Sequence, residues 1–145
     1  MIRKRLRIVL EDGAEALASG RSSDLHALRI AVKRLRYNLE FAVHLEHSEA
    51  SSALDLLALL QERLGALSDA DTFRRTYGAM LDGIEADDPR RPGLENLRDS
   101  ARTDRERALE AVRDLWHKGG EKPYPEKLAA SISAALGSLS PKPES

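Results

Sequence analysis

The sequence predicts an all-α fold, an antiparallel four-helix bundle followed by a short C-terminal helix. Four long segments repeat apolar residues at spacings of three and four, which is the period of one helix face. Short connecting segments separate them, and no stretch alternates apolar and polar residues as a half-buried strand would. Long amphipathic helices joined by short loops bury their apolar faces against one another, so a bundle is the expected architecture.

Composition supports one helical core and excludes several classes of protein. The 145 residues are 41% hydrophobic and 32% charged, which suits one folded domain rather than a disordered chain. Aromatic residues make up only 4%, so leucine and alanine must fill the core. Cysteine is absent, which rules out disulfides and thiolate metal sites, and no apolar run approaches the ~20 residues of a membrane span. The basic N-terminus meets acidic residues too soon for a signal peptide, so we expect a cytoplasmic protein without membrane association.

The first predicted helix runs from about Ile2 to Ala18, and the second runs from about Asp24 to His47. Basic residues crowd the first two turns of the first helix, where they oppose the helix dipole unless an anion lies near. They fit either a solvated helix end or part of a binding surface. Ser22 or Ser23 is suited to cap the second helix, because a serine hydroxyl accepts a hydrogen bond from a free backbone N–H.

The third predicted helix begins after Ser48 and continues to about Leu81. Gly65 lies inside its leucine stripe at a cost of about 1 kcal/mol relative to alanine, and such a glycine usually lets another helix approach closely. Turn-forming residues at 83–92 predict a loop, and the fourth helix follows from about Gly93 to Lys118. Its predicted inner stripe comprises Leu94, Leu97, Ala101, Ala108, Val112, Leu115 and Trp116.

Domain organisation follows from these elements. Residues 1–120 form the predicted four-helix domain, and residues 121–145 form a proline-bounded connector, a short helix and a tail. Pro123 and Pro125 impose an extended connector. The short helix, from about Glu126 to Leu136, is apolar enough to dock on the bundle.

The second predicted helix carries a basic face opposite its apolar stripe. At about 100° per residue, Leu28, Val32, Leu35 and Leu39 lie on one side. The opposite side bears His26, Arg29, Lys33, Arg36 and Tyr37, with Arg34 on the flank. Neighbouring like charges repel one another, so such a line is best tolerated when an anion neutralises it. Arginine grips phosphate oxygens in pairs, lysine adds a mobile charge, and histidine and tyrosine add hydrogen-bond donors.

Simpler interpretations of this face stay open. Many basic helix faces are only solvated, and a histidine such as His26 is often a capping or internally satisfied residue. The arginines of this helix also have potential internal ion-pair partners in Asp69 and Asp71.

A second group of cations lies on the predicted fourth helix, and it comprises Arg98, Arg102 and Arg105. They repeat the spacing of four and three, but they lie beside the apolar stripe rather than opposite it. This position fits either the rim of a groove between helices or side chains whose stems cover the core while their charges reach water.

Two sequence elements carry a family resemblance. The run LHALRIAVKRLRYNLEF is followed about 20 residues later by LLALLQERLGALSDADTF. Together they resemble the CHAD domain, the conserved-histidine α-helical domain. His26, Arg29, Lys33, Arg34, Arg36 and Tyr37 match its signature H-x-x-R-x-x-x-K/R-R-x-R-Y, and Leu64, Gly65 and Asp69 match its L-G-x-x-x-D element.

The resemblance implies an all-helical fold that binds inorganic polyphosphate through basic residues, often at polyphosphate granules. The main contacts would be Arg29, Lys33, Arg36 and His26, with Tyr37 as an added donor and Arg34, Arg98, Arg102 and Arg105 as second choices. Asp69 would be structural, orienting an arginine from the second helix. Full members have two similar four-helix halves. This chain corresponds to one half and is closer to the second, since Ser68 stands where the first half commonly carries an arginine. The resemblance therefore implies one of two arrangements: two chains pair as a homodimer that rebuilds the groove, or the chain is a half-domain with weaker binding.

We expect binding of polyphosphate rather than catalysis. The sequence lacks a phosphate-binding loop of the form G-x-x-x-x-G-K-[ST], and its acids lack partner histidines at metal-ligand spacing, so no cofactor and no metal are expected. Binding of nucleic acid or of an acidic protein is the alternative. Nucleic acid is the less favoured ligand. Tyr37 is the only aromatic residue on the basic face that could stack on a base, and the net charge of the chain is −1.

Overall fold

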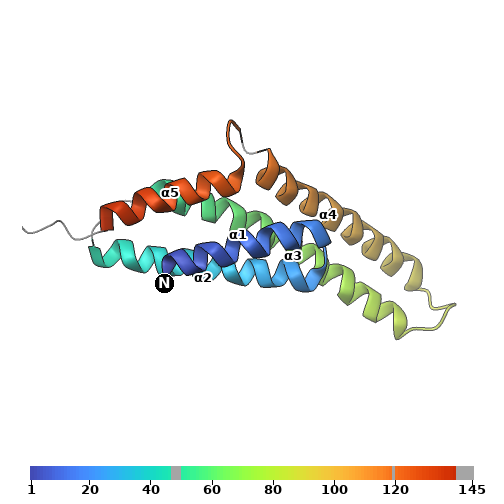
Figure 1. Ribbon diagram of the computed structural model, residues 1–145. Helices are drawn as coiled ribbons and strands as arrows, with labels where there is room; N and C mark the ends of the chain where they lie inside the picture. Colours follow the sequence, from blue (N-terminus) through green and yellow to red (C-terminus); the bar gives the residue numbers. More distant parts are fainter. Residues whose placement is uncertain (47–49, 119, 140–145) are drawn as a thin grey trace, which may run out of the picture.

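The computed structural model describes residues 1–46, 50–118 and 120–139, which form five helices and contain no strand. The helices are α1 (Ile2–Ser19), α2 (Ser22–Glu46), α3 (Ser51–Asp82), α4 (Arg91–His117) and α5 (Tyr124–Leu139), arranged as in Figure 1. The predicted all-α bundle is therefore confirmed. The predicted boundaries at His47 and Ser48 lie outside the described residues.

α1 and α2 form an antiparallel hairpin with a very short turn (Figure 1). Gly20 ends α1 with φ 64°, a left-handed conformation that glycine adopts without steric cost, and its N–H donates to the Ala16 carbonyl at 2.8 Å. Ser22 is the first residue of α2, so it is not the cap that its sequence position suggested. Its hydroxyl instead accepts a hydrogen bond from Arg105 of α4 at 3.3 Å.

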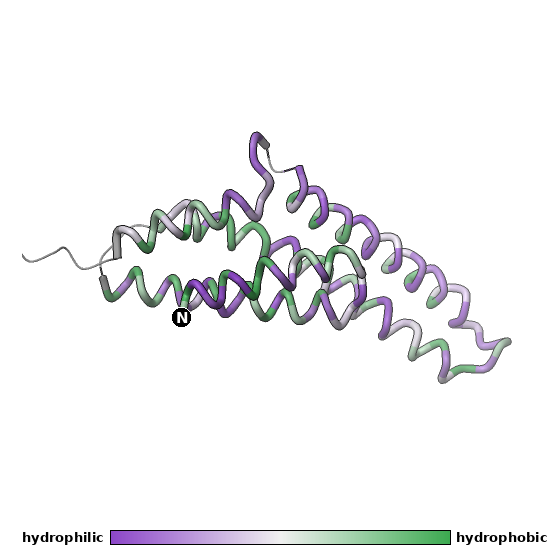
Figure 2. Tube along the Cα trace, viewed as in Figure 1, coloured by the Kyte–Doolittle hydropathy of each residue, from purple (hydrophilic) through white to green (hydrophobic). Residues whose placement is uncertain are grey.

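α3 and α4 form a second antiparallel hairpin, whose tip extends past the ends of α1 and α2 (Figure 1). Arg91 stabilises the tip, because its guanidinium donates to the carbonyls of Leu81 at 3.0 Å and Ile84 at 2.9 Å. α4 starts at Arg91 rather than Gly93, with Pro92 in its first turn, where a missing N–H has no cost. Hydrophilic residues predominate along α4 in Figure 2, as expected for a helix that packs by one side only.

The core is made mainly of leucine and alanine from all five helices. The apolar stripe of α2 is buried as predicted, and Leu28, Val32, Leu35 and Leu39 are all inaccessible to solvent. α5 contributes Tyr124, Leu128, Ile132 and Ala135 to the same core cluster. The Tyr124 hydroxyl donates to the Leu56 carbonyl of α3 at 2.8 Å, and burial raises the pKa of this hydroxyl above its ordinary value. The division at residue 120 stays a prediction.

Gly13, and not Gly65, is the helix glycine that lies against a neighbouring helix. A Cβ atom built on Gly13 would overlap the ring of Trp116 on α4. A Cβ atom on Gly65 would meet no atom of the described chain within 4 Å. The expectation that Gly65 admits a neighbouring helix is therefore wrong, and Gly13 takes that role at the contact of α1 with α4. No helix among the described residues is long and apolar enough to cross a membrane.

Candidate functional site

The basic face of α2 lies opposite the apolar stripe that buries this helix against the core, and its residues are exposed or half-buried. His26 and Lys33 are exposed, and Arg29 and Arg36 are half-buried. The Lys33 ammonium lies 5.9 Å from the centre of the Tyr37 ring, within the range of a cation–π contact. The line of cations that the sequence predicted is therefore present on one side of one helix.

A pocket of about 440 Å³ lies at the N-terminal end of this line. This volume falls within the range of small-ligand sites. Its lining comes from the start of α2, the middle of α3 and one side chain of α4, and it comprises Ser22, Ser23, Leu25, His26, Arg29, Leu64, Leu67, Ser68, Asp71, Arg75 and Arg105. We call it the α2–α3 pocket. It brings together three of the predicted site residues, His26, Arg29 and Arg105.

The deepest polar group of the α2–α3 pocket is Asp71, which is 6% exposed. Arg74 donates to its Oδ1 atom at 2.7 Å, and Arg105 donates to the same atom at 2.9 Å. Burial alone would raise the pKa of Asp71, but hydrogen bonds from Arg74 and Ser22 and the charges of Arg105 and Arg74 outweigh it and hold the pKa below its ordinary value. Asp71 is therefore a carboxylate that organises the surrounding arginines.

Arg105 joins three helices at this point. Besides Asp71 of α3, its guanidinium donates to the Gly20 carbonyl at 2.8 Å, in the turn between α1 and α2. Its side chain is only 17% exposed. The sequence predicted Arg105 as a secondary ligand contact. Its Nε atom and one terminal nitrogen already donate to protein groups, so its direct effect is to fix the base of the pocket.

Arg75 is a pocket cation that sequence reasoning missed. Its side chain is 64% exposed, and its Nε atom lies 3.8 Å from Asp71 Oδ2, at the outer limit of an ion pair. Because Asp71 is already paired with Arg74 and Arg105, Arg75 is held loosely. Its spacing from Asp71 on one helix was a usable signal, since residues four apart share a helix face.

Asp69 does not orient an arginine of α2, so that expectation is wrong. It is exposed, and among the described residues it takes part in no ion pair. Asp71 has the structural role, and its partners come from α3 and α4 rather than α2. The alternative in which Asp69 and Asp71 neutralise the α2 arginines is also excluded. A shift of two residues turns a helical side chain by about 200°, from solvent to the interior.

Other predicted residues lie away from the α2–α3 pocket. Arg36 donates to Glu40 at 2.9 Å and to Gln61 of α3 at 3.1 Å, so its guanidinium is partly occupied. Arg34 lines a separate depression of about 300 Å³ between α1 and α2, which also includes Arg5 and Asp12.

Arg98 and Arg102 of α4 are also outside the pocket lining. Both lie near the carboxylate of Asp99, at 3.3 Å and 3.7 Å. Within the described parts of the chain, no three histidine, aspartate or glutamate side chains are grouped as metal ligands would be.

Comparison with known proteins identifies one family. The family model of the CHAD domain matches residues 1–78, which is more than half of the 145 residues and includes α1, α2 and most of α3. The matched region supplies all of the pocket lining except Arg105. No curated protein and no solved structure matches the chain. This chain, with its basic α2 face beside α3, therefore belongs to the CHAD domain family.

Proposed function

We propose that this protein binds inorganic polyphosphate along the basic face of α2. CHAD domains are associated with polyphosphate in general. The observation that carries the proposal for this chain is the α2–α3 pocket, where His26, Arg29 and Arg75 from two helices line one cavity. Lys33 continues the cationic line along α2. Polyphosphate is a flexible polyanion without a sequence to read, so a row of cations with added donors is enough to hold it.

The ligand would engage cations that the protein leaves available. Lys33 is exposed, and Arg29 and His26 form no ion pair among the described side chains. These residues therefore exchange water for phosphate oxygens without breaking an internal salt bridge. Arg36 would first have to break its hydrogen bond to Glu40 or to Gln61, so we rank it below Arg29 and Lys33 as a ligand contact.

Calorimetric titration with long-chain polyphosphate at two salt concentrations tests this proposal. Tight binding to the wild type should weaken steeply at the higher salt, because each neutralised phosphate releases a counterion. The Arg29→Glu/Lys33→Glu variant should lose at least about 100-fold in affinity, since each lost charge-assisted contact accounts for roughly tenfold or more. Absence of binding to folded wild-type protein would overturn the proposal.

A matched control carries the same change in net charge elsewhere. Arg63 and Arg107 are exposed and do not line the α2–α3 pocket. The Arg63→Glu/Arg107→Glu variant should retain most of the affinity of the wild type. An equal loss in both double variants would mean that overall charge, not the basic face of α2, attracts the polymer. Single-stranded RNA at the same salt concentration serves as a competitor and should displace polyphosphate poorly.

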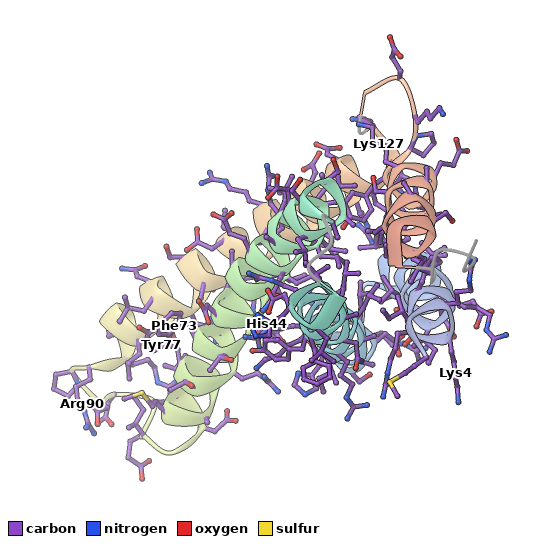
Figure 3. The ribbon with its side chains drawn as sticks, turned by 90° about the vertical axis from the view of Figure 1, so that its left-hand side faces the viewer. Lys4, His44, Phe73, Tyr77, Arg90 and Lys127 are labelled. Atoms are coloured by element: carbon purple, nitrogen blue, oxygen red, sulfur yellow. The ribbon has the colours of Figure 1, made fainter. Side chains whose placement is uncertain are left out.

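We also propose that two chains pair. Large apolar side chains are exposed on the α3–α4 hairpin, including Phe73, Met80 and Leu97, each about half exposed. Phe73 stacks on Tyr77 with ring centroids 6.3 Å apart, and Figure 3 shows both on the hairpin, on the side away from α1. The sequence predicted that Leu97 lies on the inner stripe of α4, and its exposure shows that this prediction is wrong. Light scattering of the wild-type protein should give twice the mass of one chain. The Phe73→Glu variant should have the mass of one chain. A wild-type protein with the mass of one chain would contradict the pairing.

A further inference from the structure

The α2–α3 pocket differs in shape and surroundings from the rest of the basic face. Its base is buried, because Leu25, Leu64, Leu67 and Asp71 are each at most 6% exposed. Its rim carries the cations and donors that remain available, from both α2 and α3. Beyond the pocket, the basic face is the convex surface of α2 alone, which we call the ridge. Arg36 on this ridge already donates to two protein side chains. In the α2–α3 pocket, by contrast, cationic side chains from two helices face one cavity.

The base of the pocket is closed by an internal network. Arg105 connects the Asp71 carboxylate to the Gly20 carbonyl of the α1–α2 turn, and Ser22 lies in the same network. Nε and one terminal nitrogen of Arg105 donate to these protein groups, and its side chain is only 17% exposed, so an anion gains most of its contacts from the rim. His26 and Arg29 provide donors on the α2 side, and Arg75 and Ser68 provide them on the α3 side.

A linear polyphosphate contains two chemically distinct kinds of phosphoryl group. A terminal group resembles a phosphomonoester, with a charge of about −1.5 to −2 at neutral pH and three acceptor oxygens free. An internal group has fewer free oxygens and less charge. Transfer of an anion from water to a site with a buried base is costly unless all of its oxygens accept hydrogen bonds. Donors on two sides of a pocket satisfy a terminal group better than an internal one.

We infer that the α2–α3 pocket binds the terminal phosphoryl group of a linear polyphosphate, and that the chain then leaves along α2 past Lys33. This inference rests on the proposed polyphosphate binding and adds a preference for chain ends. His26, Arg29 and Arg75 surround the terminal group, while Lys33 contacts internal groups. Arg75 turns from the distant Asp71 oxygen to the ligand, and Asp71 is a positioning residue that keeps Arg105 and Arg74 in place.

Competition between linear and cyclic phosphates tests the preference. Linear tripolyphosphate has ends, whereas cyclic hexametaphosphate carries more total charge but has none. Each is titrated into the full chain at one salt concentration. Recognition of ends predicts at least about tenfold tighter binding of the linear compound, equivalent to one charge-assisted contact. Attraction by charge alone predicts the opposite order, because electrostatic affinity increases with the number of phosphates engaged.

Two single variants that each remove one positive charge locate the effect. Arg75→Gln, in the pocket, should weaken linear tripolyphosphate about tenfold and leave cyclic hexametaphosphate nearly unchanged. Lys33→Gln, on the ridge, should weaken both compounds by a similar, smaller factor. Because both side chains are largely exposed, we expect both variants to fold, and their helical circular dichroism verifies this. Equal effects of Arg75→Gln on the two compounds would overturn the inference.

Failure of the inference is distinguishable from failure of the proposed function. If long-chain polyphosphate binds the wild type but linear tripolyphosphate binds no better than cyclic hexametaphosphate, polyphosphate binding stands and the preference for ends is wrong. If long-chain polyphosphate does not bind, both are overturned. Orthophosphate provides a further comparison: binding of orthophosphate as tight as that of tripolyphosphate would mean a site for free phosphate rather than for a chain end, and would also overturn the inference.

Discussion

The two glycines inside helices α1 and α3 allow a matched test of the packing. Gly13→Ala and Gly65→Ala make the same chemical change at helix-interior positions, and each removes a glycine cost of about 1 kcal/mol. Without tertiary contacts, both variants would be more stable than the wild type by the same amount. The structure predicts effects of opposite sign.

The difference arises from Trp116. A Cβ atom at Gly13 would lie 2.6 Å from Trp116 Cζ2 and 2.9 Å from Cζ3, well inside contact distance. The ring has little room to move, because Trp116 is 4% exposed and stacks on buried Tyr124 with centroids 5.6 Å apart. Overpacking of this kind costs up to about 3 kcal/mol, so the net destabilisation is about 2 kcal/mol. Gly65→Ala meets nothing within 4 Å, and we expect a stabilisation of about 1 kcal/mol.

Urea unfolding followed by circular dichroism measures the two free energies, and the slope of the transition should stay constant between variants. Trp116 is the only tryptophan in the sequence, so its fluorescence reports directly on this contact. The emission spectrum should change in Gly13→Ala and not in Gly65→Ala. A Gly13→Ala variant that unfolds at the same urea concentration as Gly65→Ala would refute the packing of α1 against α4 described above.

Two further predictions concern buried polar groups. Asp71→Asn should cost about 2 to 3 kcal/mol of unfolding free energy, because Arg105 and Arg74 lose a charged acceptor. Since the folded state holds the pKa of Asp71 below its ordinary value, its stabilisation is present above pH ~4 and is lost as the pH falls further. Acid titration of unfolding should therefore show a shallower decline in Asp71→Asn; parallel decline in both proteins would contradict this role. Tyr124→Phe should cost about 1 kcal/mol in thermal or urea unfolding by removing the hydrogen bond to Leu56, and no measurable loss would mean that this bond contributes nothing.

Local pattern was sufficient for the helices, the buried stripe and the basic line. The 3.6-residue period places Leu28 and Leu35 on one side of α2 and Arg29 and Lys33 on the other, whatever the helix packs against. For the same reason both predicted ends of α1 and the predicted end of α3 were close to those observed. Properties that depend on angular position along a single helix can be inferred from a single sequence.

The pocket and the roles of its residues depended on how separate helices meet. Arg105 reaches Asp71 across 34 positions of sequence and Gly20 across 85, and no spacing rule connects residues that far apart. The same limit explains why Asp69, and not Asp71, was predicted to be structural, because the partner that reveals the role of Asp71 lies on α4. It also explains why Gly65, and not Gly13, was predicted to lie against another helix. The sequence does not distinguish a glycine that faces Trp116 from one that faces open space. The side of each helix that is apolar or cationic follows from residue spacing along the chain, because the helical period converts spacing into angle. The cations that share a cavity are set by contacts between helices, because such contacts join residues that are far apart in sequence.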